Sequence, residues 1–124
     1  MASQFDMIQK QILERQDKIF RGSIIQLSTM IVNNTPVDEG ALKASFIFSI
    51  GSPSSEVRES GDSIESIKIS LNDFKIGQTG YMTNAQEHAI PNEFGWSAQA
   101  PNGMVRKNVA KWASINEKVT RAIR

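Results

Sequence analysis

The chain has 124 residues, the size of one domain, with 40% apolar and 22% charged residues as in ordinary globular proteins. It contains no cysteine, which excludes a disulfide framework, a thiolate zinc site and a cysteine nucleophile, and its net charge of +1 gives no overall attraction to nucleic acid. No apolar stretch is long enough for a membrane span or a signal peptide. We therefore expect a single soluble domain over residues 1–124 that is made in the cytoplasm and contacts no membrane.

A long helix is predicted over residues 1–33. Ser3 can cap its start, Gly22 is a candidate for a bend or break, and Pro36 follows its end. Its apolar residues recur at spacings of three and four, with one heptad step: Phe5, Ile8, Ile12, Ile19, Phe20, Ile24, Leu27 and Ile31. A helix of this length spans about 45 Å, so we expect part of it to lie outside the protomer's own core.

An antiparallel sheet of three to four strands is predicted over residues 45–84. It follows a helical turn at residues 40–45, for which Asp38 is a suitable cap. Apolar residues alternate in "SFIFSI" and again in "SIKISL", and short strands are expected around Phe74 and in "YMT". The segment 51–63 is rich in Gly, Ser, Pro and charge, which indicates an exposed and mobile hairpin loop.

The chain is predicted to close with two helical segments. Residues 85–94 favour a short helix stopped by Gly95, and residues 104–124 place one apolar face on a final helix. The predicted fold class is therefore α+β, with the N-terminal and C-terminal helices packed on the small antiparallel sheet.

The stretch "EFGWSAQAPNGMVRKNVAKW", residues 93–112, has the most unusual composition. Phe94 and Trp96 flank a glycine, and two interpretations remain open for them: they fill the core under the loop, or they anchor a subunit interface, where Trp is enriched. Trp112 is in phase with the apolar face of the last helix, which favours a place in the core.

The residues predict no catalytic, cofactor-binding or metal site. His88 is the single histidine, and its carboxylate neighbours do not have metal-ligand spacing. No serine lies in a nucleophile-elbow motif, and "GQTG" lacks the lysine and the spacing of a phosphate loop.

Charge is divided unevenly along the chain. Residues 34–103 carry four cations against nine carboxylates, and residues 104–124 carry six cations against one. Such a polar molecule suits head-to-tail contacts, although a solvated helix face with cations near a helix C-terminus accounts for the pattern equally well.

Three segments, taken in order, resemble the neck and tail-completion proteins of long-tailed bacteriophages, a group that includes relatives of the minor tail protein Z of phage lambda. The first, after the long helix, is matched by Pro36, Asp38, Gly40, Leu42 and Lys43. The second, a strand end and the close of a short helix, is matched by Thr83, Asn84, Glu93, Phe94 and Gly95. The third opens the last helix, with Pro101, Gly103, Met104, Val105 and Arg106. The departure is "EHAIPNEF", where the group usually has a tyrosine-alanine pair and no proline.

The resemblance implies a structural virion protein, not an enzyme. It implies a cyclic homo-oligomer, typically of six copies, at the joint between capsid and tail, through which DNA passes without sequence-specific binding. Its partners would be the portal or head-completion protein on one side and the tail terminator or tail tube protein on the other. Candidate interface residues are Phe94, Trp96, Met104, Arg106 and Lys107.

Two other function classes remain open. The basic C-terminal helix permits a small nucleic-acid-binding module, although no recognition helix or base-stacking motif accompanies it. A small hydrolase with an unrecognised site is the third class, and one histidine without cysteine leaves it little to build with.

Overall fold

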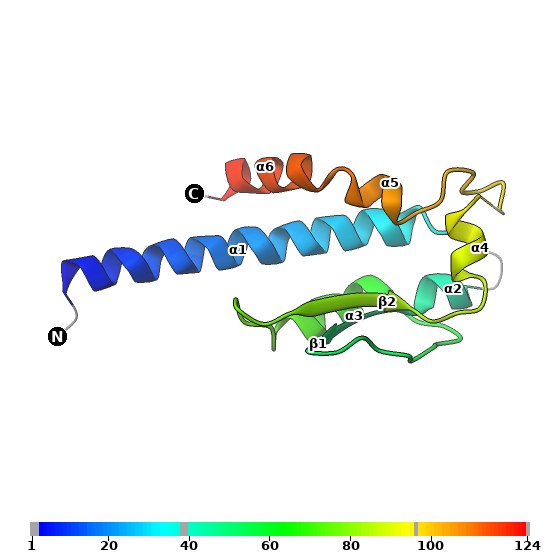
Figure 1. Cartoon of the computed structure of the whole chain (residues 1–124), viewed down its shortest axis with the longest axis horizontal. Helices are drawn as coiled ribbons and strands as arrows, with labels where there is room; N and C mark the ends of the chain where they lie inside the picture. Colours follow the sequence, from blue (N-terminus) through cyan, green and yellow to red (C-terminus); the bar gives the residue numbers. More distant parts are fainter. Residues whose placement is uncertain (1–2, 38–39, 96, 124) are drawn as a thin grey trace.

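The computed structural model describes residues 3–37, 40–95 and 97–123, and arranges them in three layers around one long helix. Helix α1 (Gln4–Asn33) is the middle layer (Figure 1). On one side of it lie α5 (Arg106–Val109) and α6 (Trp112–Ala122). On the other side lie a small sheet and α3 (Ser63–Leu71). The mixed α and β class is confirmed, but the C-terminal helix packs on α1 and not on the sheet.

Helix α1 begins and ends where the sequence predicts. Ser3 and Asp6 form a reciprocal capping box, in which each backbone N–H donates to the other side chain at 3.1–3.3 Å. The helix continues unbroken through Gly22, where a Cβ atom would lie only 2.9 Å from Val119 Cγ1 of α6. Gly22 therefore allows two helices to approach closely and does not bend the chain.

The sheet has two strands among the described residues, not the three to four predicted. Strand β1 (Phe46–Ile50) pairs antiparallel with β2 (Gly80–Asn84), with Phe46 opposite Asn84 and Ile50 opposite Gly80. The expected strand around Phe74 is also wrong: only an isolated bridge joins Ile76 to Gln78, and the Phe74 ring stacks on Phe20 in the core at 5.3 Å.

The segment predicted as the second strand is helix α3. Ile67 and Leu71 are buried in both interpretations, because two residues four positions apart share a face in a strand and in a helix. Ile69 distinguishes them: it is exposed, as helical spacing requires. The Asp62 side chain accepts a hydrogen bond from Glu65 N at 3.2 Å, so a helix cap decides the outcome.

Residues 51–62 connect β1 to α3, so they are not a hairpin loop. The Ser45 hydroxyl donates to Arg58 O and accepts from Arg58 N, both at 2.9 Å, and Thr83 Oγ1 donates to Ser54 O at 3.0 Å. These bonds hold the connection against both strands. The mobility of this connection in the free subunit stays a prediction. The hydrogen bonds just described oppose such mobility.

The core lies between α1, α3 and the inner face of the sheet. It takes the C-terminal half of α1, alternate residues of β1 and one face of α3, together with a methionine from before α5. Its buried members are Ile31, Val32, Phe46, Phe48, Ile67, Leu71, Phe74 and Met104.

The predicted helix over residues 104–124 is divided into α5 and α6 by a turn at Ala110 and Lys111. Asn108 of α5 is fully buried and donates to Asn34 Oδ1 at 3.1 Å, which ties α5 to the C-terminal end of α1. The turn then lets α6 follow α1 in the opposite direction. Trp112 is only half-buried, with its ring edge-to-face on Phe20 at 6.5 Å.

The remaining helices are short. Helix α2 (Ala41–Ala44) follows Gly40, and Asp38, its predicted cap, lies outside the described residues. Helix α4 (Ala89–Glu93) is shorter than the predicted segment 85–94.

Candidate functional site

The Glu93 carboxylate joins two of the segments that carry the family resemblance. Its Oε1 accepts from the backbone N–H groups of Met104 and Val105, and its Oε2 accepts from that of Arg106, each at 2.8 Å. Arg106 Nε also donates to Oε2 at 3.1 Å. One side chain from the end of α4 thus satisfies the free N–H groups at the start of α5.

Two glycines permit this contact. Gly103 has φ of +79°, and a Cβ atom there would overlap the carbonyl oxygen of Glu93. Gly95 has φ of +88°, and a Cβ atom there would overlap the carbonyl oxygen of Pro101. Both positions therefore need glycine for its conformation and for its missing side chain. The prediction that Gly95 stops the short helix is confirmed, since α4 ends two residues before it.

The same bonds set the charge state of Glu93. Burial alone would raise the pKa of this carboxyl group, but hydrogen bonds from the backbones of Val105, Arg106 and Met104, and from the Arg106 side chain, lower the pKa below its usual value. Glu93 is therefore a structural anion, ionised throughout the neutral range, and is unsuited to be a general acid.

Phe94 does not fill the core. Its side chain is 69% exposed, and the Arg106 guanidinium lies over its ring at 4.3 Å from the centroid. The interpretation of Phe94 as a core residue is therefore wrong, and its interpretation as an anchor of a subunit interface stays a prediction.

The other predicted interface residues differ in accessibility. Met104 is 1% exposed and belongs to the protomer's core, so it can meet a partner only through the floor of a pocket. Arg106 is exposed but already paired with Glu93, and Lys107 is half-buried. Trp96 lies outside the described residues.

An open pocket of about 280 Å³ lies between β2, α4 and α5. Two large apolar side chains that line this pocket are also exposed: Ile90, which is 72% exposed, and Phe94. The lining unites the second and third segments of the resemblance with the start of β1, and comprises Phe46, Met82, Thr83, Asn84, Ala89, Ile90, Glu93, Phe94, Met104, Val105 and Arg106. Sequence reasoning missed Ile90 and the role of Glu93, because no local pattern links a carboxylate to a helix that starts thirteen residues later.

The N-terminal half of α1 is the second accessible apolar surface. Phe5, Ile8 and Ile12 are 73%, 49% and 52% exposed, whereas Ile31 near the other end of the helix is fully buried. The prediction that part of α1 lies outside the core is confirmed. Figure 1 shows this end of α1 extending past the end of α6.

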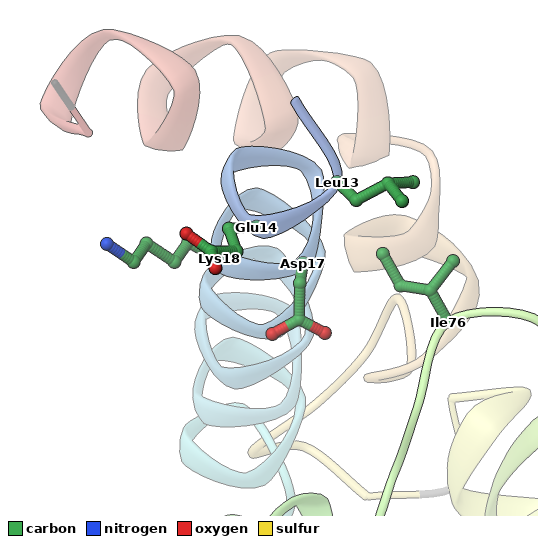
Figure 2. A pocket seen from close by; sticks show the side chains of 5 residues that line it. All are labelled: Leu13, Glu14, Asp17, Lys18 and Ile76. Carbon is green, nitrogen blue, oxygen red and sulfur yellow. The ribbon is translucent and has the colours of Figure 1, made fainter. Parts of the chain in front are cut away.

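A shallow pocket of about 420 Å³ lies where α1 passes the loop after α3. Leu13 and Ile76 point toward one another across it, and Asp17 lies beside them (Figure 2). Leu13 and Ile76 are both about half exposed, so these two side chains extend the accessible apolar surface of α1 around a second side.

The described ranges contain no group of three or more His, Asp or Glu side chains able to hold a metal ion. His88 is exposed at the start of α4, where its carbonyl oxygen accepts from Asn92 N and Nδ2. Within the same ranges, no helix is long and apolar enough to cross a membrane.

Comparison with known proteins adds no relative. No protein-family profile, curated protein or solved structure matches the chain.

Proposed function

We propose that the protein is a structural component of a phage virion that assembles as a ring of six copies at the joint between capsid and tail. The portal or head-completion protein lies on one side of the ring and the tail terminator or tube on the other, and DNA passes through the lumen without sequence-specific contacts.

The observation that carries the proposal is the exposed apolar half of α1. Three large side chains, Phe5, Ile8 and Ile12, project beyond the core on a capped, regular helix. A monomer gains nothing from such a surface, and contiguous exposed apolar residues mark interaction sites. The surface supports an assembling protein over a small enzyme.

The resemblance supports the same proposal at a second place. Glu93, Gly95, Gly103 and Arg106 were matched as separate pieces of a loose pattern, and in the structure they contact one another or their neighbours as one unit. A pattern whose members serve one structural purpose is a better family signature than isolated matches.

Electron microscopy of virions of the encoding phage tests the proposal directly. We expect density for this chain at the capsid–tail joint with six-fold symmetry, and a Lys107→Glu variant should assemble more slowly because head-to-tail charge attraction is lost. Density in a two-fold arrangement, or none at the joint, would contradict the proposal.

A filter-binding assay examines the nucleic-acid alternative. Lys118 and Arg121 are exposed along α6, and Lys111 is exposed in the turn before it, but Arg121 is paired with Glu117. We expect weak, salt-sensitive DNA binding without sequence preference. Tight binding to a defined sequence, abolished by Lys118→Glu, would favour the nucleic-acid-binding module instead.

A further inference from the structure

The molecule carries an apolar projection at one end and an apolar pocket at the other. The projection is the row Phe5, Ile8 and Ile12 on α1, and the pocket is the one bordered by Ile90 and Phe94. Figure 1 places the N-terminal end of α1 and helix α4 at opposite ends of the long axis. The two surfaces of one copy therefore lie too far apart to cover one another.

The projection continues a surface that α6 covers further along α1. Ser23 donates to Asn116 Oδ1 at 2.6 Å, and Arg15 Nη1 donates to Ile123 O at 2.8 Å, where α6 ends. Positions 5, 8, 12, 15, 19 and 22 recur at three and four, so they form one side of the helix. On this side α6 packs on Gly22 and reaches as far as the exposed Arg15 through a hydrogen bond, whereas the described residues before Arg15 are exposed and form no described hydrogen bond with α6.

The pocket has the size and chemistry of a site for a side chain. Its volume of about 280 Å³ is just below the range of small-molecule sites, which is roughly 300–1,000 Å³. Its lining is largely apolar, with Met82 and Met104, whose flexible side chains adapt to an inserted group.

Charged groups lie beside both surfaces, and at the pocket the exposed Arg106 guanidinium is already paired with Glu93. Asp6 lies next to Phe5 in the first turn of α1, and the Arg106 guanidinium, 63% exposed, lies over Phe94 at the pocket. A partner that brings an apolar residue with an adjacent carboxylate fits the pocket, and a second copy of this chain brings both.

We propose that the N-terminal end of α1 of one copy docks in the pocket of the next, with Phe5 between Ile90 and Phe94 and Asp6 toward Arg106. The contact joins two different surfaces, so it is heterologous and propagates into a ring or, without closure, a filament. It rests on the proposed function in that it supplies the contact between copies of the ring.

Cysteine cross-linking tests the contact cleanly, because the chain contains no cysteine. Each cysteine replaces a side chain of the proposed contact, so we would mix Phe5→Cys with Ile90→Cys protein well above the concentration at which the native chain associates, and also in assembled particles, before adding a short bis-maleimide. Cross-links between residues 5 and 90 are expected, and the double variant should give a ladder that ends at the ring size. Phe5→Cys mixed with Ser55→Cys, in the exposed connection after β1, is the matched control and should give none.

Affinity gives a second measurement. Phe5→Ala should weaken self-association at least about tenfold, as for an aromatic anchor at an interface. Asp6→Lys should also weaken it, beyond Ser3→Ala, which removes the same capping box without changing the charge.

The outcomes separate docking from function. Links between two copies of residue 5, or no 5–90 link in either preparation, overturn the docking. If six-fold density stands at the capsid–tail joint without that link, the proposed function survives and the contact is wrong. If the link forms but the protein is absent from the joint, the contact stands and the virion role fails.

Discussion

The two ends of the molecule differ in how they are held. At one end α1 is a regular helix with large apolar residues in water. Before residue 10, its only described bonds beyond the helical ladder are the two hydrogen bonds of the capping box of Ser3 and Asp6. At the other end the chain is irregular, yet Glu93 alone accepts four hydrogen bonds through its carboxylate.

Regular secondary structure is therefore a poor guide to where this protein is stable. The described bonds at the helical end are local, whereas the irregular end is held by hydrogen bonds between residues eleven to thirteen positions apart. Substitutions at the irregular end should affect global unfolding, whereas those at the helical end should affect local fraying and association.

The largest effect is expected for Gly103→Ala. The new Cβ atom would overlap the carbonyl of Glu93 at a φ of +79°, so we expect a loss of about 3 kcal/mol or more in the free energy of unfolding. Gly77→Ala is the control: its φ is also positive but its surroundings are open, and it should cost only about 1–2 kcal/mol. If both variants lose the same free energy of unfolding in urea titrations, the overlap at residue 103 is relieved in the folded protein.

Glu93→Ala should cost about 2 kcal/mol, because three backbone N–H groups at the start of α5 lose their acceptor. Glu87→Ala, at an exposed neighbouring carboxylate, should change unfolding by less than about 0.5 kcal/mol. If the two variants unfold at the same denaturant concentration, the contact of Glu93 with α5 contributes nothing to stability.

Acid should weaken the irregular end next. The pKa of Glu93 is lowered in the folded state, so its contribution is fully present above the unfolded value of about 4.3 and is lost as pH falls through the folded value. Between pH 6 and pH 3, the free energy of unfolding should therefore fall more in the native chain than in the Glu93→Gln variant. If the free energy of unfolding falls equally with pH in both chains, the lowered pKa of Glu93 in the folded state is contradicted.

Ser3→Ala removes the capping box and should reduce the stability of the first turns of α1 by about 1 kcal/mol. The effect should be local. Amide exchange should accelerate for residues 5–10 while that of Ile31 stays unchanged, since Ile31 is in the core. Faster exchange at both places would mean that α1 unfolds as one unit.

The smallest effect on stability is expected for Ile12→Ala. This side chain is half exposed, so its loss should change the unfolding free energy of the monomer by less than about 0.5 kcal/mol. Ile31→Ala is the matched substitution in the buried half of the same helix and should cost about 3 kcal/mol. Similar costs would show that the N-terminal half is packed after all.

The sequence predicts what local chemistry determines. Ser3 and Pro36 define α1 because a cap and a proline act within a few residues, and β1 follows from alternation. The spacing of Ile67 and Leu71 fits both a strand and a helix, and the apolar Ile69 between them misled because it completes an alternating pattern although it is exposed. The signal for a helix start is Asp62, three residues before Glu65.

What depends on distant contacts was not predictable. Helix α6 packs on α1 because Gly22 leaves room for it, and a glycine in a helical pattern signals a bend as readily as a close approach. In the candidate site, Phe94 and Arg106 were identified individually, but their contact and the binding of Glu93 to α5 require the loop conformation that Gly95 and Gly103 permit.

Because α1 runs unbroken through Gly22, the number of its residues fixes the distance between its two ends. Its 30 residues span about 45 Å and run from the apolar projection to the end that Asn34 and Asn108 join to α5. Seven residues inserted before Arg15 would lengthen that span by about 10 Å and keep the same side facing outward, whereas two would turn it by about 200°. In a head-to-tail ring, the number of residues in α1 would determine the distance from one copy to the next, and so the circumference of the ring.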